Sequence, residues 1–261
     1  PQAYDARLPV VMSDLGLVRY LGYAELPQAA ALKTRLEVEQ AAQLEHGVHL
    51  IVARSADGSL VVGDSHGAHL WPGLSAVLPQ ANVLQATSTG CKPVIGTRGE
   101  ATCRKLMSEA LGPSLDRIKP DILILSARWL ETDLPDVQRT LEALHDKAGR
   151  IVVFGPVPEY AMPLPRLLAQ VVDGRDPSLL LAARHTEQAA VDKALGEAVR
   201  ALGATYVSSY RYLCPSDIAA CMTVTATIPI QWDYGHLTRE GSVAVANLAK
   251  RQGALNPAGF K

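Results

Sequence analysis

The chain has 261 residues, of which 48% are hydrophobic and 20% are charged, so it can bury a large core as one big domain or two small ones. Its formal net charge of -1 provides no field that would attract nucleic acid or anionic lipid, which excludes nucleic acid as an expected partner. No apolar run approaches the roughly 18 to 20 residues that are needed to cross a bilayer.

The first fifty residues differ in pattern from the rest of the chain. Residues Leu26–Glu45 are rich in Ala, Leu, Gln and Glu, which favours a helix. We therefore expect an N-terminal helical linker or extension over residues 1–50 and one α/β domain over residues 51–261. Because the first residue is Pro1 rather than Met, we also expect a processed product or a piece of a longer chain.

From Leu60 onward, apolar runs alternate with helical patterns, as is typical of an α/β domain. Apolar runs such as DILIL indicate strands that are covered on both faces by helices. The pattern predicts a three-layer α/β/α fold with a mostly parallel five-stranded sheet. The predicted strands are Leu60–Val62, Asn82–Ala86, Asp121–Leu125, Arg150–Phe154 and Thr205–Val207, the predicted helices are Ala101–Leu111, Leu134–Ala148, His185–Leu202 and one after Thr238, and the predicted surface connections are Pro156–Pro165 and Val172–Pro177.

The four cysteines form two close pairs, Cys91 with Cys103 and Cys214 with Cys221. Local pairing is the simplest of the three connectivities, and closing loops this short would stabilise the fold by about 2 to 3 kcal/mol each in the chain-entropy model. Disulfides persist in oxidising compartments, so the pairs predict an extracytoplasmic protein. The alternative is four reduced, buried thiols in a cytosolic enzyme; neither pair has the Cys-x-x-Cys spacing of a zinc site.

Three polar residues, Asp64, Ser65 and His66, follow the first predicted strand and Gly63. In a doubly wound parallel sheet, ligands bind outside the carboxyl ends of the strands. A serine at that place has an exposed hydroxyl, and the backbone N–H groups of the turn into the next helix can face a developing oxyanion. Ser65 is therefore the candidate nucleophile, and Asp64 is expected to fix the turn by hydrogen bonds to neighbouring backbone.

The candidate base lies near the C-terminus, in the segment WDYGHLTREGS. Asp233 and His236 are three residues apart, so the carboxylate can hold one ring nitrogen while the other faces a nucleophile. Thr238 is expected to start the last helix. Taken alone, Asp-x-x-His is as consistent with a solvated turn whose imidazole caps a helix, but together with Gly-Asp-Ser it indicates a Ser-His-Asp triad.

These motifs, in this order, resemble the SGNH (GDSL-type) hydrolase superfamily. More narrowly, GDSHG, TGCKP, DILILSARW, VVFGPVPE, the LCP...C loop and DYGHLTREGS are together similar to the SGNH domains fused to the acyltransferase-3 family of integral membrane proteins. The resemblance covers about Leu60 to Leu248 and implies an SGNH/flavodoxin-like strand order within residues 51–261. Those relatives O-acetylate bacterial surface polysaccharides, including lipopolysaccharide O-antigen. The resemblance thus implies a periplasmic domain that works without a cofactor and is tethered to the inner membrane in the full-length protein.

The resemblance also implies the roles of individual residues. Ser65 matches the nucleophile, His236 the general base and Asp233 the orienting carboxylate. The oxyanion hole would take one N–H from Ser65 and one from Gly90 in STGCKP.

One family position departs from the pattern. The third block normally ends in Gly-x-Asn-Asp, where the Asn amide donates to the oxyanion, and Arg128 stands where Asn is expected. Arg128 could replace that donor, because a guanidinium is a stronger donor than an amide, or could form a structural ion pair with Asp133 or Glu131.

Further candidates concern substrate and metal. Trp129 could stack on a sugar ring, or could belong to the core. His66 and His69 with Asp64 could suggest metal ligands, but their spacing fits equally one side chain that lines a pocket and one that faces the sheet. We expect His66 near substrate and no metal.

The sequence as a whole favours an O-acyltransferase, with acetyl as the expected group, that acts on a cell-surface polysaccharide through an acyl-serine intermediate. An integral-membrane domain, upstream or in a partner, would supply the acyl donor. The alternatives are a secreted carbohydrate acetylesterase, which would use the same residues on water, and a catalytically degenerate module that only presents a glycan.

Overall fold

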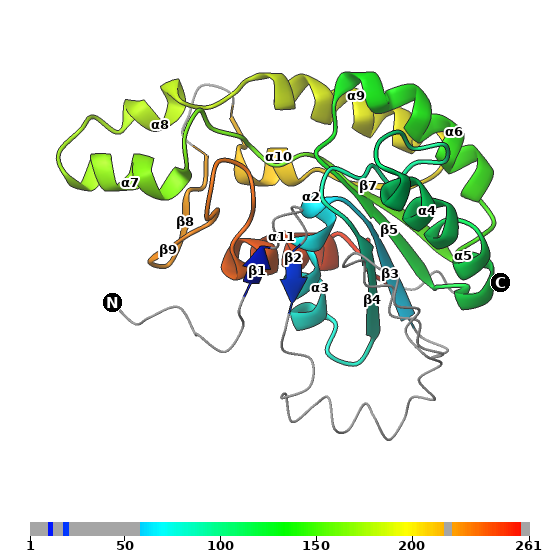
Figure 1. Ribbon diagram of the computed structural model, residues 1–261. Coiled ribbons are helices and arrows are strands. Elements are labelled where there is room, and N and C mark those ends of the chain that lie inside the picture. The colour runs from blue at the N-terminus through cyan, green and yellow to red at the C-terminus, as the bar shows by residue number, and fades with distance from the viewer. Residues whose placement is uncertain (1–9, 13–17, 21–57, 217–220, 257–261) are drawn as a thin grey trace.

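Figure 1 shows the computed structural model, which describes residues 10–12, 18–20, 58–216 and 221–256. A five-stranded sheet forms the centre of the molecule, and its neighbouring strands are all parallel. The strand order β4-β3-β5-β6-β7 confirms the predicted flavodoxin-like order. The strands are β3 (Gly58–Gly63), β4 (Asn82–Thr87), β5 (Ile122–Ser126), β6 (Arg150–Phe154) and β7 (Thr205–Val207).

Helices cover both faces of this sheet (Figure 1). Alternate residues of the strands face two separate apolar cores, which is why an inner strand such as β5 has apolar residues at successive positions. One core, with Leu60 and Leu123, packs against α4, α5, α6 and α9; the other, with Val61 and Ile124, packs against α3, α7, α8, α10 and α11. The helices are α2 (Ser65–Ala68), α3 (Trp71–Val77), α4 (Ala101–Ala110), α5 (Pro113–Ile118), the 3-10 helix η1 (Glu131–Asp133), α6 (Leu134–Leu144), α7 (Leu164–Val172), α8 (Ser178–Ala182), α9 (Glu187–Ala201), α10 (Ser209–Leu213) and α11 (Arg239–Arg251).

Two short antiparallel ladders lie outside the main sheet. β8 (Val224–Thr225) pairs with β9 (Ile228–Pro229) in a hairpin before the last helix. β1 (Val10–Met12) pairs with β2 (Val18–Tyr20) inside the expected N-terminal extension. The helix predicted over Leu26–Glu45 lies outside the described residues.

The prediction that Pro156–Pro165 is a surface connection is wrong for its first half. Residues 156–160 are buried, and the helix α7 begins at Leu164. The backbone of this segment is hydrogen-bonded to the loop before the last helix, since Tyr160 N donates to the carbonyl of Tyr234. The predicted loop Val172–Pro177 is exposed, as expected.

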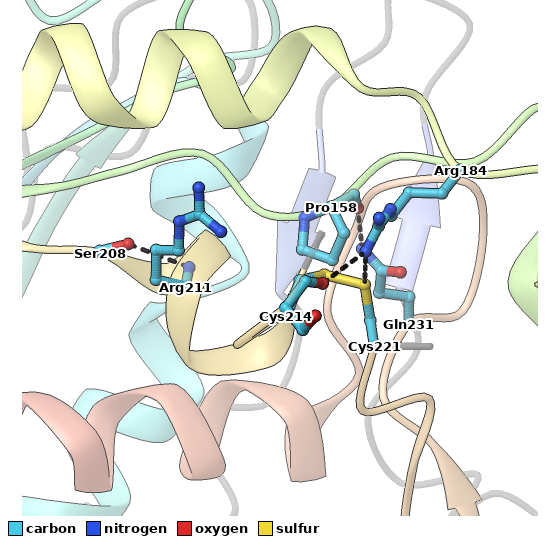
Figure 2. Close-up of a disulfide and its surroundings, with 8 residues drawn as sticks. Pro158, Arg184, Ser208, Arg211, Cys214, Cys221 and Gln231 are labelled. Atoms are coloured by element: carbon cyan, nitrogen blue, oxygen red, sulfur yellow. Dashed lines mark hydrogen bonds between the residues drawn. A yellow bond between two sulfur atoms is a disulfide. The ribbon is translucent and has the colours of Figure 1, made fainter. Parts of the chain in front are cut away.

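Both predicted disulfides are present, Cys91–Cys103 and Cys214–Cys221. Figure 2 shows the second one beside Arg184, whose Nη1 lies 3.0 Å from Sγ of Cys221. Close to it, Nε2 of Gln231 donates to the carbonyl of Pro158 at 2.7 Å. The disulfide therefore anchors the start of the segment that leads to Asp233 and His236.

Candidate active site

The end of β3 places Ser65 at the carboxyl edge of the sheet. Gly63, the last residue of β3, packs so closely against β5 that a Cβ there would lie 2.0 Å from the carbonyl oxygen of Ser126. Asp64 then caps α2, because its carboxylate accepts from the N–H of His66 at 2.7 Å and from that of Arg128 at 2.9 Å. This confirms the predicted role of Asp64 in fixing the turn, and it makes Ser65 the first residue of the helix.

A five-residue loop, residues 232–236, carries the candidate base and its carboxylate. Its two ends are joined by a hydrogen bond from Trp232 N to the carbonyl of His236 at 3.0 Å and by a bridge between Gln231 and Leu237. Thr238 then caps α11 with its side-chain oxygen, as predicted. The end of β3 and this loop lie side by side, although 171 positions separate Ser65 from His236 in the sequence.

The structure brings together the three residues that the sequence predicts as nucleophile, base and orienting carboxylate. Nε2 of His236 lies 2.8 Å from Oγ of Ser65, and Nδ1 of His236 lies 2.7 Å from Oδ2 of Asp233. The side chains of His236 and Asp233 are 15% and 16% exposed, so the site is at the surface but not fully solvated. Hydrogen bonds at these distances are those that a serine nucleophile and a histidine base require.

The other carboxylate oxygen of Asp233 holds the loop itself. It accepts from the N–H of Gly235 at 2.9 Å and from that of His236 at 2.7 Å. Burial alone would raise the pKa of Asp233, but hydrogen bonds from the His236 ring and from these two N–H groups outweigh it and lower the pKa. Asp233 is therefore ionised at neutral pH and keeps the imidazole in one orientation.

Two further imidazoles lie on the inner side of His236. The ring centroids of His66 and His69 are 4.9 Å and 5.9 Å from that of His236. Burial lowers the pKa of His66 and of His69 well below the ordinary value, so both are neutral. Nδ1 of His69 accepts from the N–H of Leu237 at 3.3 Å, which links α2 to the loop that carries His236.

The model of the family described as "SGNH domain (fused to AT3 domains)" matches residues 38–251, most of the chain. The chain is an SGNH domain. No curated protein matches it.

Solved structures of similar fold include the periplasmic domain of a lipopolysaccharide acetyltransferase from Salmonella ser. Paratyphi A. That domain is 21% identical to this SGNH domain, with 76% of this chain and 84% of that chain covered and a TM-score of 0.66. A GDSL-like lipase from Bacteroides thetaiotaomicron is 10% identical over 76% of this chain and 89% of that chain, with a TM-score of 0.47. A catalytic mutant of an acetylxylan esterase from Geobacillus stearothermophilus is 12% identical over 80% of this chain and 96% of that chain, with a TM-score of 0.47.

Of the two alternatives for Trp129, the structure supports the core. Trp129 is 2% exposed and its indole N–H donates to the carbonyl of Phe154 at 2.8 Å. His66, which was expected near substrate, is 3% exposed and packs against the ring of His236. In the part of the chain that the structure describes, no cluster of three or more His, Cys, Asp or Glu residues could hold a metal ion.

The ion-pair partner of Arg128 is also different from the prediction. Instead of Asp133 or Glu131, Arg128 binds Glu159, with Nε at 2.8 Å from one carboxylate oxygen and Nη2 at 2.6 Å from the other. Glu159 lies in the buried segment after β6 and is 3% exposed, while the side chain of Arg128 is 49% exposed. Its Nη1 makes no hydrogen bond within the described residues.

Gly90 lies in the turn that follows β4, the strand next to β3. Its φ is 69°, a conformation that favours glycine, and a Cβ there would meet nothing within 4 Å. The turn begins beside the end of β3, since Ser88 N donates to the carbonyl of Gly63 at 3.1 Å. Gly90 is exposed and lies in a turn at the same carboxyl edge of the sheet as Ser65.

Sequence reasoning missed two aromatic side chains at the site. Trp232 and Tyr234 flank Asp233 in the loop and are 46% and 37% exposed. The segment WDYGH could have indicated them, because two residues so close to a catalytic-type Asp-x-x-His must border it.

Of the described helices, none is both long and apolar enough to span a membrane.

Proposed function

We propose that this SGNH domain is a serine acyltransferase in which Ser65 is the nucleophile, His236 the general base and Asp233 the group that orients it. The observation that carries the proposal is the continuous chain of hydrogen bonds from Ser65 through His236 to Asp233, at 2.8 Å and 2.7 Å. Such a chain removes the hydroxyl proton as the oxygen attacks and stabilises the resulting imidazolium.

The first half-reaction forms the acyl-serine. Oγ of Ser65 attacks the carbonyl carbon of the acyl donor while its proton passes to Nε2 of His236. The bond from that carbon to the leaving group then breaks, and the leaving group takes the proton from His236. In the second half-reaction an acceptor hydroxyl gives its proton to His236 and attacks the acyl-serine, and the departing Oγ of Ser65 takes the proton back.

The oxyanion of each tetrahedral intermediate would be held by backbone N–H groups. As the first residue of α2, Ser65 has an N–H with no partner inside its helix, and Gly90 offers a second from the neighbouring turn. Nη1 of Arg128 is the candidate third donor, because Nε and Nη2 are held by Glu159. Loss of one oxyanion donor lowers the rate of acyl transfer by about 10²- to 10³-fold, so a hydrogen bond from Nη1 to the oxyanion would raise that rate by a similar factor.

The acyl group and the acceptor are proposed from relatives and compartment. Membership of a family fused to AT3 domains supports delivery of the acyl group by an integral-membrane domain. A similar fold is the periplasmic domain of a lipopolysaccharide acetyltransferase, which supports acetyl as the group and a surface polysaccharide as the acceptor. The two disulfides support a periplasmic location.

Hydrolysis is the second candidate function. Ser65 is partly exposed, so water can reach an acyl group on it and take the place of the sugar hydroxyl. A secreted carbohydrate acetylesterase would use the same three residues.

The test is acylation of Ser65 by 4-nitrophenyl acetate, detected as an acetyl adduct on the Ser65 peptide by mass spectrometry. We expect the adduct in the 261-residue chain and its loss in Ser65→Ala, whereas Ser108→Ala, at an exposed serine of α4, should retain it. Absence of any adduct from the unsubstituted chain would leave only the glycan-presenting alternative. Release of acetate with or without an added sugar acceptor then separates transfer from hydrolysis.

A further inference from the structure

The exposed aromatic side chains of the described residues are concentrated at the candidate base. Large hydrophobic side chains that are exposed include two aromatic rings, Trp232 and Tyr234, and both belong to the loop of residues 232–236. Exposing an indole and a phenol ring to water is unfavourable unless they contact something in the working protein. We name these two rings the aromatic platform.

The platform surrounds His236 on the side away from the core. The indole of Trp232 stacks on the imidazole with ring centroids 5.4 Å apart and an angle of 22° between planes. The ring of Tyr234 meets the same imidazole edge-on, at 5.8 Å and 73°. Because one indole face lies against His236, the exposed part of Trp232 consists mainly of the opposite face and the ring edges.

The backbone that carries both rings is fixed at two points. The backbone N–H of Trp232 donates to the carbonyl of His236, and the carbonyl of Tyr234 accepts from the backbone N–H of Tyr160 in the buried segment. The guanidinium of Arg128 lies 5.7 Å from the centre of the Tyr234 ring, a cation–π contact. Surfaces that are fixed before binding lose less entropy when a ligand arrives.

We propose that the aromatic platform is a sugar-binding subsite for the acyl acceptor, and this inference rests on the proposed acyltransferase function. The acceptor must bring a hydroxyl to Nε2 of His236, so whatever molecule is acylated has to contact the rings that border this imidazole. The apolar face of a pyranose, formed by its C–H groups, packs on an indole or phenol ring as another apolar surface does. The half-exposed Arg128, whose guanidinium lies over the Tyr234 ring, can donate to hydroxyl groups of the sugar.

The geometry also points to which sugar of a chain the platform holds. A ring stacked on the outer face of Trp232 lies one further stacking distance from the imidazole, about 10 Å in all when about 4.5 Å is added to the observed separation of 5.4 Å. That is too far for its own hydroxyl to reach Nε2. Trp232 therefore holds the neighbour of the reacting sugar, and the domain should prefer oligosaccharides to single sugars.

The experiment measures acetyl transfer from 4-nitrophenyl acetate to trisaccharides of glucose, mannose, galactose or rhamnose, and to the methyl glycoside of each sugar. The best acceptor of the unsubstituted chain is then used with Trp232→Ala, Trp232→Phe and the control Val172→Ala, whose side chain is 85% exposed in the loop after α7. Each rate is divided by the rate at which the same variant acetylates Ser65, so that any change in the base itself cancels.

We expect Trp232→Ala to raise KM for the trisaccharide about 3- to 10-fold, the range of one aromatic stacking contact, with little change of KM for the methyl glycoside. Trp232→Phe should recover part of the loss, and Val172→Ala should behave as the unsubstituted chain. Equal effects of Trp232→Ala on trisaccharide, methyl glycoside and water would show that the ring only supports His236, and would overturn the inference. No loss in Trp232→Ala would overturn it too. If Ser65 is never acetylated, or no sugar is acetylated by the unsubstituted chain, the proposed transferase function itself fails.

Discussion

The two buried imidazoles behind His236 predict a loss of stability on mild acidification. Burial holds the pKa of His69 well below the ordinary value of 6.5, so the folded state keeps His69 neutral while the unfolded chain takes up a proton. The unfolded state is then favoured as the pH falls through 6.5. A histidine that stays neutral when folded destabilises the fold by about 1 kcal/mol at pH 5.5 and by almost nothing at pH 7.5.

His66 is equally buried and has the same direction of shift, so the two together predict a loss of about 2 to 3 kcal/mol between pH 7.5 and pH 5.5. The perturbation is His69→Asn, in which the amide oxygen can accept from Leu237 N in place of Nδ1. Urea unfolding, followed by circular dichroism at both pH values, should show that this variant loses about 1 kcal/mol less than the unsubstituted chain on acidification.

The matched control is His145→Asn, because the side chain of His145 is 73% exposed at the end of α6. This variant should lose as much stability as the unsubstituted chain. Equal pH dependence in His69→Asn and in the unsubstituted chain would refute the reasoning, because His69 would then titrate alike in both states.

Three further predictions concern the loop of residues 232–236 and the disulfide that precedes it. Asp233→Asn should lower the rate of Ser65 acylation by about 10³- to 10⁴-fold in a stopped-flow assay with 4-nitrophenyl acetate. Because the folded-state pKa of Asp233 is lowered, the ionised carboxylate stabilises the fold above the ordinary pKa value of 3.8, and this stabilisation disappears below it. The difference in stability between Asp233→Asn and the unsubstituted chain should therefore shrink as the pH falls below about 4. A constant difference would contradict this. Replacing Cys214 and Cys221 together by Ser should cost about 2 to 3 kcal/mol of stability in urea unfolding, because the disulfide closes a loop of sequence separation 7. Unchanged stability would contradict this.

The sequence predicted the parts of the site that local patterns encode. The inner strands of the sheet are largely apolar runs, Gly-Asp-Ser follows one of them and Asp-x-x-His precedes a helix start, so the meeting of Ser65 and His236 could be predicted from the chain alone. The short helices α7 and α8 were missed because the prolines around them favour a loop.

Contacts between distant segments could not be predicted in the same way. Arg128 has acidic residues close by in sequence, yet it binds Glu159, 31 positions away, because the segment after β6 is buried beside the end of β5. Trp129 follows Arg128 directly, so its sequence position does not tell whether its ring faces substrate or the core. Only the packing around residues 128 and 129 decides that the ring faces the core. Burial depends on what lies opposite a residue in space, and local patterns do not encode this.

One closed loop carries both His236 and Asp233, so the distance between these two residues does not depend on the distance from His236 to Ser65. Because Asp233 accepts from the backbone and the ring of His236 within a span of four residues, a rigid shift of this loop would lengthen the gap to Ser65 while the imidazole kept its tautomer. The base therefore travels with its own orienting group. When such a shift reverses, the proton acceptor returns already aligned, and no side chain has to search for its partner again.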